Sequence, residues 1–152
     1  MMKPFLQVDQ KLWRGPQPTP NDLSQLKHRG VRAVYNLREE SGASRTLALQ
    51  AGLNYHHLPV EDWNVPTLAQ VLEFLEMLKL PDFSPGLVHC WGGVGRTGIF
   101  VSCYRASLGL DMEAAIERSD LETPHLMMNG PQRNWLRQHA GHFQISSSST
   151  GQ

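Results

Sequence analysis

The chain has 152 residues, of which 40% are hydrophobic and 18% charged, together with 13 glycines and 10 prolines. This composition is typical of a globular domain and excludes a fibrous or wholly disordered chain. Fourteen Lys and Arg residues balance fourteen Asp and Glu residues, so no net charge favours binding to nucleic acid or to an anionic membrane.

Membrane and disulfide classes are also disfavoured. No apolar run reaches the roughly 20 residues of a membrane span, and the amino terminus lacks the apolar core of a signal peptide. Two cysteines are too few for a disulfide framework or a four-ligand zinc site. We therefore expect a cytoplasmic, monomeric domain without a metal over residues 1–145. The serine-rich tail, residues 146–152, is expected to be disordered.

Strand and helix patterns alternate along the chain. Short strands are predicted at residues 5–8, 12–14, 31–37, 54–60 and 87–89. Helices are predicted between Thr19 and Gly30, over 44–51, after Thr67, over 96–108, from Asp111 through residue 117, and over 132–139. The alternation predicts an α/β fold with a mostly parallel sheet covered by helices on its faces. In such sheets ligands bind at the carboxyl ends of the strands, where the loops after Leu37, Val60 and His89 converge.

The third of these loops has the sequence His-Cys-Trp-Gly-Gly-Val-Gly-Arg-Thr-Gly over residues 89–98. Five residues between Cys90 and Arg96 allow consecutive backbone N–H groups to turn inward and form a site for an anion. The following helix adds the positive end of its dipole, and this positive environment favours the thiolate form of Cys90. The planar guanidinium of Arg96 can bind two phosphoryl oxygens at once.

These residues resemble the signature of the cysteine-dependent protein tyrosine and dual-specificity phosphatases, HCxxGxxR followed by Ser or Thr. The resemblance implies a small dual-specificity-like domain with a four- or five-stranded sheet and no metal or other cofactor. It also implies roles in catalysis for Cys90, Arg96 and Thr97, and a role for His89 in shaping the loop. Phosphate is then expected to bind within residues 91–96: Trp91, Gly92, Gly93, Val94, Gly95 and Arg96. A nucleotide P-loop, a rhodanese-like sulfur-transfer loop and a non-catalytic phosphate-binding module are the alternatives.

An acid is needed to protonate the leaving oxygen of a phosphate ester. In the resembling family it is an aspartate on an upstream loop, and the matching segment here is residues 59–67. Asp62, four residues before Pro66, is the candidate. Glu61 is the competing candidate, because adjacent loop residues point apart and sequence does not show which one faces Cys90. An exposed acidic pair without a catalytic role is the alternative to both.

Gln132 is a candidate for positioning the hydrolytic water. Many relatives use a glutamine in the pattern Glu-Thr-Pro-x-Gln, but this chain has Glu-Thr-Pro-His-Leu over residues 122–126. Gln132 is therefore interpreted as a substitute, with an exposed polar residue in the first turn of a helix as the alternative.

Five further residues are interpreted from their positions. Asn36 and Arg38 end a strand at the same edge as Cys90, so they either touch substrate or belong to a solvated loop. Cys103 is expected in the core, and alternation along a strand should turn His56 and His57 apart.

The resemblance implies a phosphorylated protein or a small phosphate ester as the substrate. Phosphotyrosine is favoured, with phosphoserine and phosphothreonine as extensions. The loop between Cys90 and Arg96 contains no lysine, which argues against highly charged inositol phosphates.

Overall fold

The computed structural model describes residues 4–143. Its five strands form one sheet in the order β1-β2-β5-β3-β4. The strands are β1 (Leu6–Gln7), β2 (Leu12–Gly15), β3 (Ala33–Arg38), β4 (Asn54–Val60) and β5 (Gly86–His89). β1 runs antiparallel to β2, and the other three pairings are parallel. The predicted mostly parallel sheet is confirmed.

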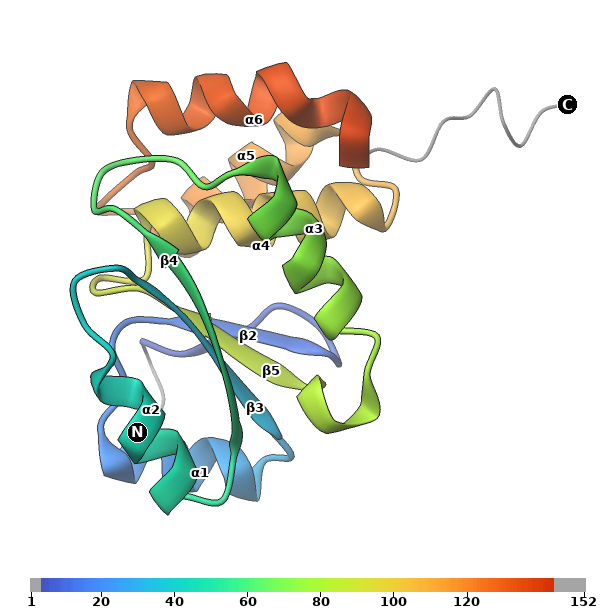
Figure 1. The fold of residues 1–152 in the computed structure, drawn as a ribbon. Helices are drawn as coiled ribbons and strands as arrows, with labels where there is room; N and C mark the ends of the chain where they lie inside the picture. Colours follow the sequence, from blue (N-terminus) through green and yellow to red (C-terminus); the bar gives the residue numbers. More distant parts are fainter. Residues whose placement is uncertain (1–3, 144–152) are drawn as a thin grey trace, which may run out of the picture.

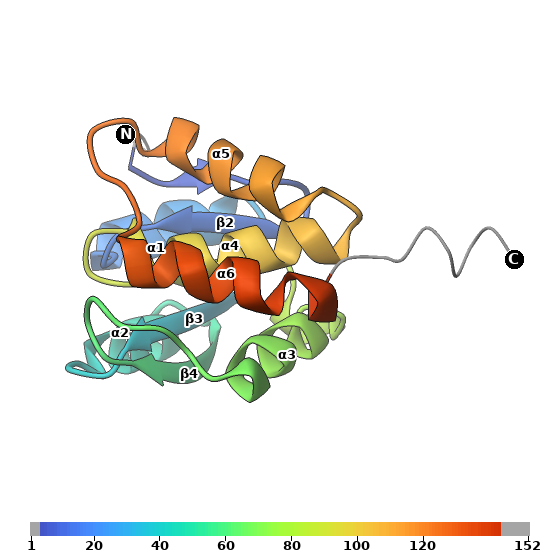
Figure 2. The ribbon, with the colours of Figure 1, turned by 90° about the horizontal axis from the view of Figure 1, so that it is seen from above.

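Helices cover both faces of this sheet (Figure 1). One face carries α1 (Pro20–His28) and α2 (Ala43–Gln50). The other carries α3 (Leu68–Met77), α4 (Gly95–Ser107), α5 (Met112–Glu122) and α6 (Gly130–Phe143). A short 3₁₀ turn, η1 (Pro81–Phe83), leads into β5. Figure 2 shows α4 lying between α5 and α3, beneath α6. The predicted α/β class is therefore correct.

The helix starts follow the capping signals in the sequence. Thr19 and Asp22 form a capping box at α1, and Thr67 and Gln70 form a second one at α3. The predicted ends of the last two helices were too early, since α5 continues to Glu122 and α6 to Phe143. Tertiary contacts stabilise these added turns, because the Glu122 carboxylate is paired with Arg105 and Phe143 is buried.

The core lies on both sides of the sheet. Leu23, Leu26 and Val34 belong to a cluster under α1 and α2, and a larger cluster fills the space around α4. Residues 96–106 of α4 are all buried, as the apolar pattern around this helix predicts. Cys103 is fully buried there, which confirms its core position, and burial raises the pKa of its thiol well above the ordinary value.

Within residues 4–143, no helix combines the length and apolarity needed to cross a membrane. The predicted disordered tail, residues 146–152, lies outside the described residues. The single domain over residues 1–145 stays a prediction.

Candidate active site

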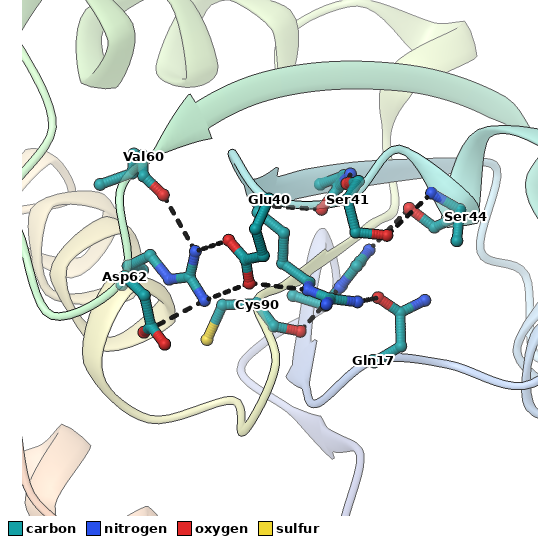
Figure 3. Close-up of polar contacts among 12 residues, drawn as sticks. Gln17, Glu40, Ser41, Ser44, Val60, Asp62 and Cys90 are labelled. Carbon is teal, nitrogen blue, oxygen red and sulfur yellow. Dashed lines mark hydrogen bonds and ion pairs between the residues drawn. The ribbon is translucent and has the colours of Figure 1, made fainter.

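Three strand ends bring the candidate side chains together. β3, β4 and β5 are parallel neighbours, so the segments that follow them meet at one edge of the sheet. Figure 3 shows Glu40 after β3, Asp62 after β4 and Cys90 after β5 lying close to one another at this edge. The predicted convergence of the three loops is confirmed.

The Cys90 sulfur accepts two hydrogen bonds from the loop that it begins. The backbone N–H of Gly93 donates to Sγ at 3.2 Å, and the Thr97 hydroxyl donates to it at 3.0 Å. Both bonds stabilise negative charge on the sulfur. Cys90 is only 3% exposed, and α4 begins five residues later at Gly95, so the positive end of a buried helix lies beside it. The structure thus brings Cys90 and Thr97 together.

Several carbonyl groups of this phosphate loop (residues 90–96) accept hydrogen bonds from residues outside the loop. The carbonyls of residues 90, 91 and 93 accept hydrogen bonds from His89 Nδ1, Gln17 N and Arg14 Nη2, each at 3.0 Å. In a trans peptide the following N–H points opposite to the carbonyl. The N–H groups of residues 91, 92 and 94 therefore face away from these partners, as an anion-binding loop requires.

Two residues of the loop show why it needs its local sequence. Gly93 has a φ of +77°, and a Cβ there would lie 2.7 Å from the carbonyl carbon of Gly15. Only glycine fits both the backbone conformation and this close approach. His89 is fully buried between the Cys90 carbonyl and the Ser44 hydroxyl, each 3.0 Å away. Burial lowers the pKa of His89 to about 4, so its ring is neutral at pH 7.

Arg96 is buried and surrounded by acceptors. Its Nη1 donates to Glu40 Oε1 at 2.7 Å and to the Val60 carbonyl at 2.9 Å. Its Nη2 donates to Glu40 Oε2 at 3.1 Å and lies 3.3 Å from Asp62 Oδ1 (Figure 3). The hydrogen bond from Arg96 is the largest cause that lowers the pKa of Glu40, to about 2. Glu40 therefore fixes the plane of the guanidinium and remains charged.

The acidic pair Glu61 and Asp62 divides as adjacent loop residues should. Asp62 turns toward Arg96 and lines the same cleft as Cys90. Glu61 turns away and accepts a hydrogen bond from the Asn64 side chain at 2.9 Å. Geometry therefore favours Asp62 over Glu61 as the carboxyl that reaches a group bound at Cys90.

Gln132 is only 1% exposed, so its interpretation as an exposed polar residue was wrong. It forms a capping box with Asn129 at the start of α6: Asn129 N donates to its Oε1 at 3.0 Å, and its own N–H donates to Asn129 Oδ1 at 2.9 Å. Its Nε2 donates to the Asn64 carbonyl at 3.2 Å. A Cβ added to Gly95 would lie within 3.0 Å of both amide atoms, so this amide packs directly on the phosphate loop.

The segment that carries Asp62 is held from the α6 side. Asn129 Nδ2 donates to the Trp63 carbonyl at 2.9 Å, next to the bond from Gln132 to Asn64. Trp63 has a φ of +65°, a backbone conformation that a bulky residue rarely adopts. These two bonds stabilise the strained turn, which keeps Asp62 directed at Arg96.

The burial of Asn36 excludes its interpretation as part of a solvated loop, whereas contact of Asn36 or Arg38 with substrate stays a prediction. Asn36 is fully buried and donates to the Ser41 carbonyl and the Tyr55 hydroxyl. Arg38 is bonded to Gln17 and Glu40, and its guanidinium lies 5.0 Å from the centre of the Trp91 ring. Arg38 therefore connects Gln17, Glu40 and Trp91 beside the site.

The described residues 4–143 contain no cluster of three or more His, Cys, Asp or Glu side chains that could hold a metal ion. The rings of His56 and His57 have different partners, as strand alternation predicts. His56 contacts the Glu73 carboxylate and His57 the Arg38 carbonyl.

Three supporting residues were missed in the sequence. Glu40 lies in one of the three converging loops, but nothing in its neighbours distinguishes it from Glu39. Arg14 is a charged residue inside an apolar strand, which is a signal of a buried partner. Asn129 directly precedes Gly130–Phe143, where an N-cap residue is expected.

The fold and the cysteine–arginine loop define the class of cysteine-dependent phosphatases. A family model described as "DSP-PTPase phosphatase fused to NAD+ Kinase" matches residues 5–138. The chain therefore belongs to this family of dual-specificity and protein tyrosine phosphatases. The match decides against the nucleotide P-loop and the rhodanese-like alternatives.

Individual relatives agree with this assignment. The chain is 30% identical over 135 residues to the tyrosine-protein phosphatase cdcA of Emericella nidulans, covering 86% of this chain and 22% of that protein. The chain spans less than two thirds of the length of the first curated relatives it matches.

Two solved structures have the same fold. The active form of Tk-PTP superposes with a TM-score of 0.80 at 23% identity, covering 93% of this chain and 99% of that one. PTPMT1 in complex with PI(5)P superposes with a TM-score of 0.79 at 21% identity, covering 98% of this chain and 99% of that one.

Proposed function

We propose that this protein hydrolyses phosphate monoesters through a cysteinyl-phosphate intermediate, with protein phosphotyrosine as the favoured substrate. The observation that carries the proposal is the Cys90 sulfur, which accepts bonds from Gly93 and Thr97 at the floor of a loop closed by Arg96. Phosphoserine and phosphothreonine are possible further substrates. The protein acts as a cytoplasmic monomer and needs no metal in this proposal.

In the first step the Cys90 thiolate attacks phosphorus and the bond to the ester oxygen breaks. The inward-facing N–H groups and Arg96 stabilise the charge on the three equatorial oxygens. Within residues 4–143, Nε is the guanidinium nitrogen of Arg96 without a hydrogen-bond partner, so it is available to the phosphoryl group. In this proposal the phosphoryl group takes the place of Asp62 beside Nη2 of Arg96, and Asp62 enters the step as the carboxylic acid. Asp62 then protonates the departing oxygen.

In the second step water attacks the phosphoryl group and the sulfur–phosphorus bond breaks. Asp62, now a carboxylate, accepts the proton of the water, and Cys90 leaves as a thiolate that Thr97 stabilises. Gln132 is proposed to orient this water. Each atom of its amide makes one hydrogen bond to the neighbouring loops and retains a second position.

The choice of phosphotyrosine rests on the charge of the cleft lining. Arg96 is the single Lys or Arg among its lining residues, whereas a polyphosphorylated inositol needs several cations. A relative with 30% identity is a tyrosine-protein phosphatase, while the structural neighbour PTPMT1 was solved with a phosphoinositide. A non-protein phosphate ester is thus the second candidate, which the same assays compare directly.

The basic test is release of phosphate from an aryl phosphate in the presence of a metal chelator. We expect turnover with a maximum on the acid side of pH 7, competitive inhibition by vanadate, and complete loss in Cys90→Ser. Turnover that survives in Cys90→Ser contradicts the assignment of the nucleophile. Binding of phosphate without turnover identifies a non-catalytic phosphate-binding module.

The acid is tested by comparing Asp62→Asn with Glu61→Gln on aryl phosphates whose phenols differ in acidity. Asp62→Asn should reduce kcat most for the poorest leaving groups, because these need the proton most. Glu61→Gln retains the oxygen that accepts the bond from Asn64 and serves as the matched control. Equal loss in Asp62→Asn for all leaving groups contradicts the role of Asp62.

A further inference from the structure

Four exposed apolar side chains surround the mouth of the active-site cleft. They are Trp63, Trp91, Leu126 and Met127, which are 74%, 63%, 64% and 58% exposed and all line the cleft of ≈ 190 Å³ that contains Cys90. They come from three separate segments: the loop after β4, the phosphate loop and the segment between α5 and α6. We call these four residues the apolar collar. Such a gathering of exposed apolar groups marks a binding surface.

Both tryptophans of the collar are exposed, and contacts hold the ring of Trp91 and the backbone of Trp63. The Trp91 indole lies against the Arg38 guanidinium at 5.0 Å, and its carbonyl accepts a bond from the backbone N–H of Gln17 at 3.0 Å. Trp63 is held in its left-handed conformation by the bond from Asn129. A strained, bulky and solvent-exposed residue does not serve stability, and this points to a role in binding.

The charges of the cleft lining offer little to a second anionic group on the ligand. The cleft is lined by one guanidinium, that of Arg96, and one carboxylate, that of Asp62. The nearby Arg38 is already bonded to Glu40 and Gln17. An acidic residue or a second phosphate beside the reacting phosphate therefore finds no unpaired cation among the lining residues, whereas a large apolar group finds two indoles, a leucine and a methionine.

We propose that the apolar collar selects protein substrates that carry large apolar residues on either side of the phosphorylated tyrosine. This inference rests on the proposed function, since it concerns the substrate of the same site. A polypeptide fits better than a lipid surface, because an anionic membrane attracts clusters of Lys and Arg that the cleft lining lacks. The Trp91 ring is already held against Arg38, so it loses little conformational entropy when a flanking side chain binds.

The test uses two phosphotyrosine peptides that are identical except for the residues next to the phosphotyrosine. One peptide carries Leu and Phe there, and the other carries Asp and Glu. We expect kcat/KM to be about tenfold or more higher for the apolar peptide, which corresponds to partial burial of one large side chain. Equal rates for the two peptides, or a faster rate for the acidic peptide, overturn the proposal.

The double variant Leu126→Ser/Met127→Ser should bring the ratio of the two rates close to one. The matched control is Leu49→Ser/Leu121→Ser, two leucines that are 59% and 69% exposed and lie outside the cleft. This control should keep the ratio. The ratio is measured within each protein preparation, so a partly unfolded sample lowers both rates and leaves it interpretable. A preserved ratio in the collar variant contradicts the proposal.

A third assay separates failure of the collar proposal from failure of the proposed function. Phosphatidylcholine vesicles that contain a phosphatidylinositol phosphate are assayed beside the peptides. Faster release of phosphate from the lipid than from either peptide overturns the polypeptide as the ligand. Turnover of an aryl phosphate without a peptide preference rejects the collar alone, whereas turnover that is absent, or that persists in Cys90→Ser, rejects the proposed function.

Discussion

At the scale of the residue, the carboxylate of Glu40 decides how Arg96 is presented. Its two oxygens accept hydrogen bonds from both terminal nitrogens of the guanidinium, which sets the plane of the fork. The variant Glu40→Gln loses one of these ion-paired acceptors and places an N–H group against the guanidinium. We expect kcat/KM on an aryl phosphate to fall about tenfold. Steady-state kinetics test this, and Glu39→Gln, at the exposed neighbouring residue, is the control. Unchanged kinetics in Glu40→Gln contradict the positioning role.

His89 gives the folded protein a pH dependence of stability. Burial lowers its pKa from 6.5 to about 4 in the folded state, so the unfolded chain binds a proton first as the pH falls. The contribution of the neutral His89 to the free energy of unfolding is therefore fully present above pH 6.5. It is lost progressively as the pH falls toward 4, by ~3 kcal/mol in total. The free energy of unfolding, measured with a denaturant at several pH values between 7 and 5, should change less with pH in His89→Gln than in the wild type. An identical change with pH contradicts a neutral buried His89.

At the scale of the element, the loop after β4 depends on the start of α6. Asn129 holds the Trp63 carbonyl and thereby the turn that directs Asp62 at Arg96. Asn129→Ala should lower kcat about tenfold for poor leaving groups and much less for good ones, since part of the acid catalysis is lost. Asn134→Ala, an exposed asparagine of the same helix, is the control.

A double-variant cycle separates this role from a general structural effect. In the Asp62→Asn background, Asn129→Ala should have almost no further effect on kcat, because the group it positions is already removed. A full and additive loss in the double variant contradicts positioning through Asp62.

The helices, strands and loops also show which features local sequence patterns predict and which features they do not. The caps at Thr19 and Thr67 and the parallel strands follow from local signals, since capping and alternation act within a few residues. The phosphate loop could be predicted because Cys90 and Arg96 act from one short segment. Glu40 lies 50 residues before Cys90, and Asn129 lies 39 residues after it, directly before α6. Only the tertiary fold brings them to the site.

At the scale of the whole molecule, a buried ion-pair network joins the sheet and helices to the phosphate loop. Arg14 of β2 is 1% exposed and donates to Glu122 of α5, to Ser119 and to the Gly93 carbonyl. Arg105 of α4 binds the same Glu122 carboxylate. The Arg14 guanidinium therefore stabilises both the packing of α5 and the outward direction of the Gly93 carbonyl.

Replacing Arg14 by methionine tests this network. Arg14→Met keeps much of the side-chain volume but leaves the buried Gly93 carbonyl and Ser119 hydroxyl without their Arg14 donor, which should cost about 3 kcal/mol of unfolding free energy. Arg137→Met is the control, because Arg137 forms an exposed surface pair with Glu113 whose loss should change the unfolding free energy far less. Denaturant unfolding measures both. A loss in Arg14→Met no larger than that of the control contradicts the network.

The most direct test of the account is to stop the reaction within its first turnovers and locate the phosphoryl group by mass spectrometry. We predict one phosphoryl group on the sulfur of Cys90, with none on any residue in Cys90→Ser. A phosphoryl group on another side chain, or rapid turnover by Cys90→Ser, contradicts the account.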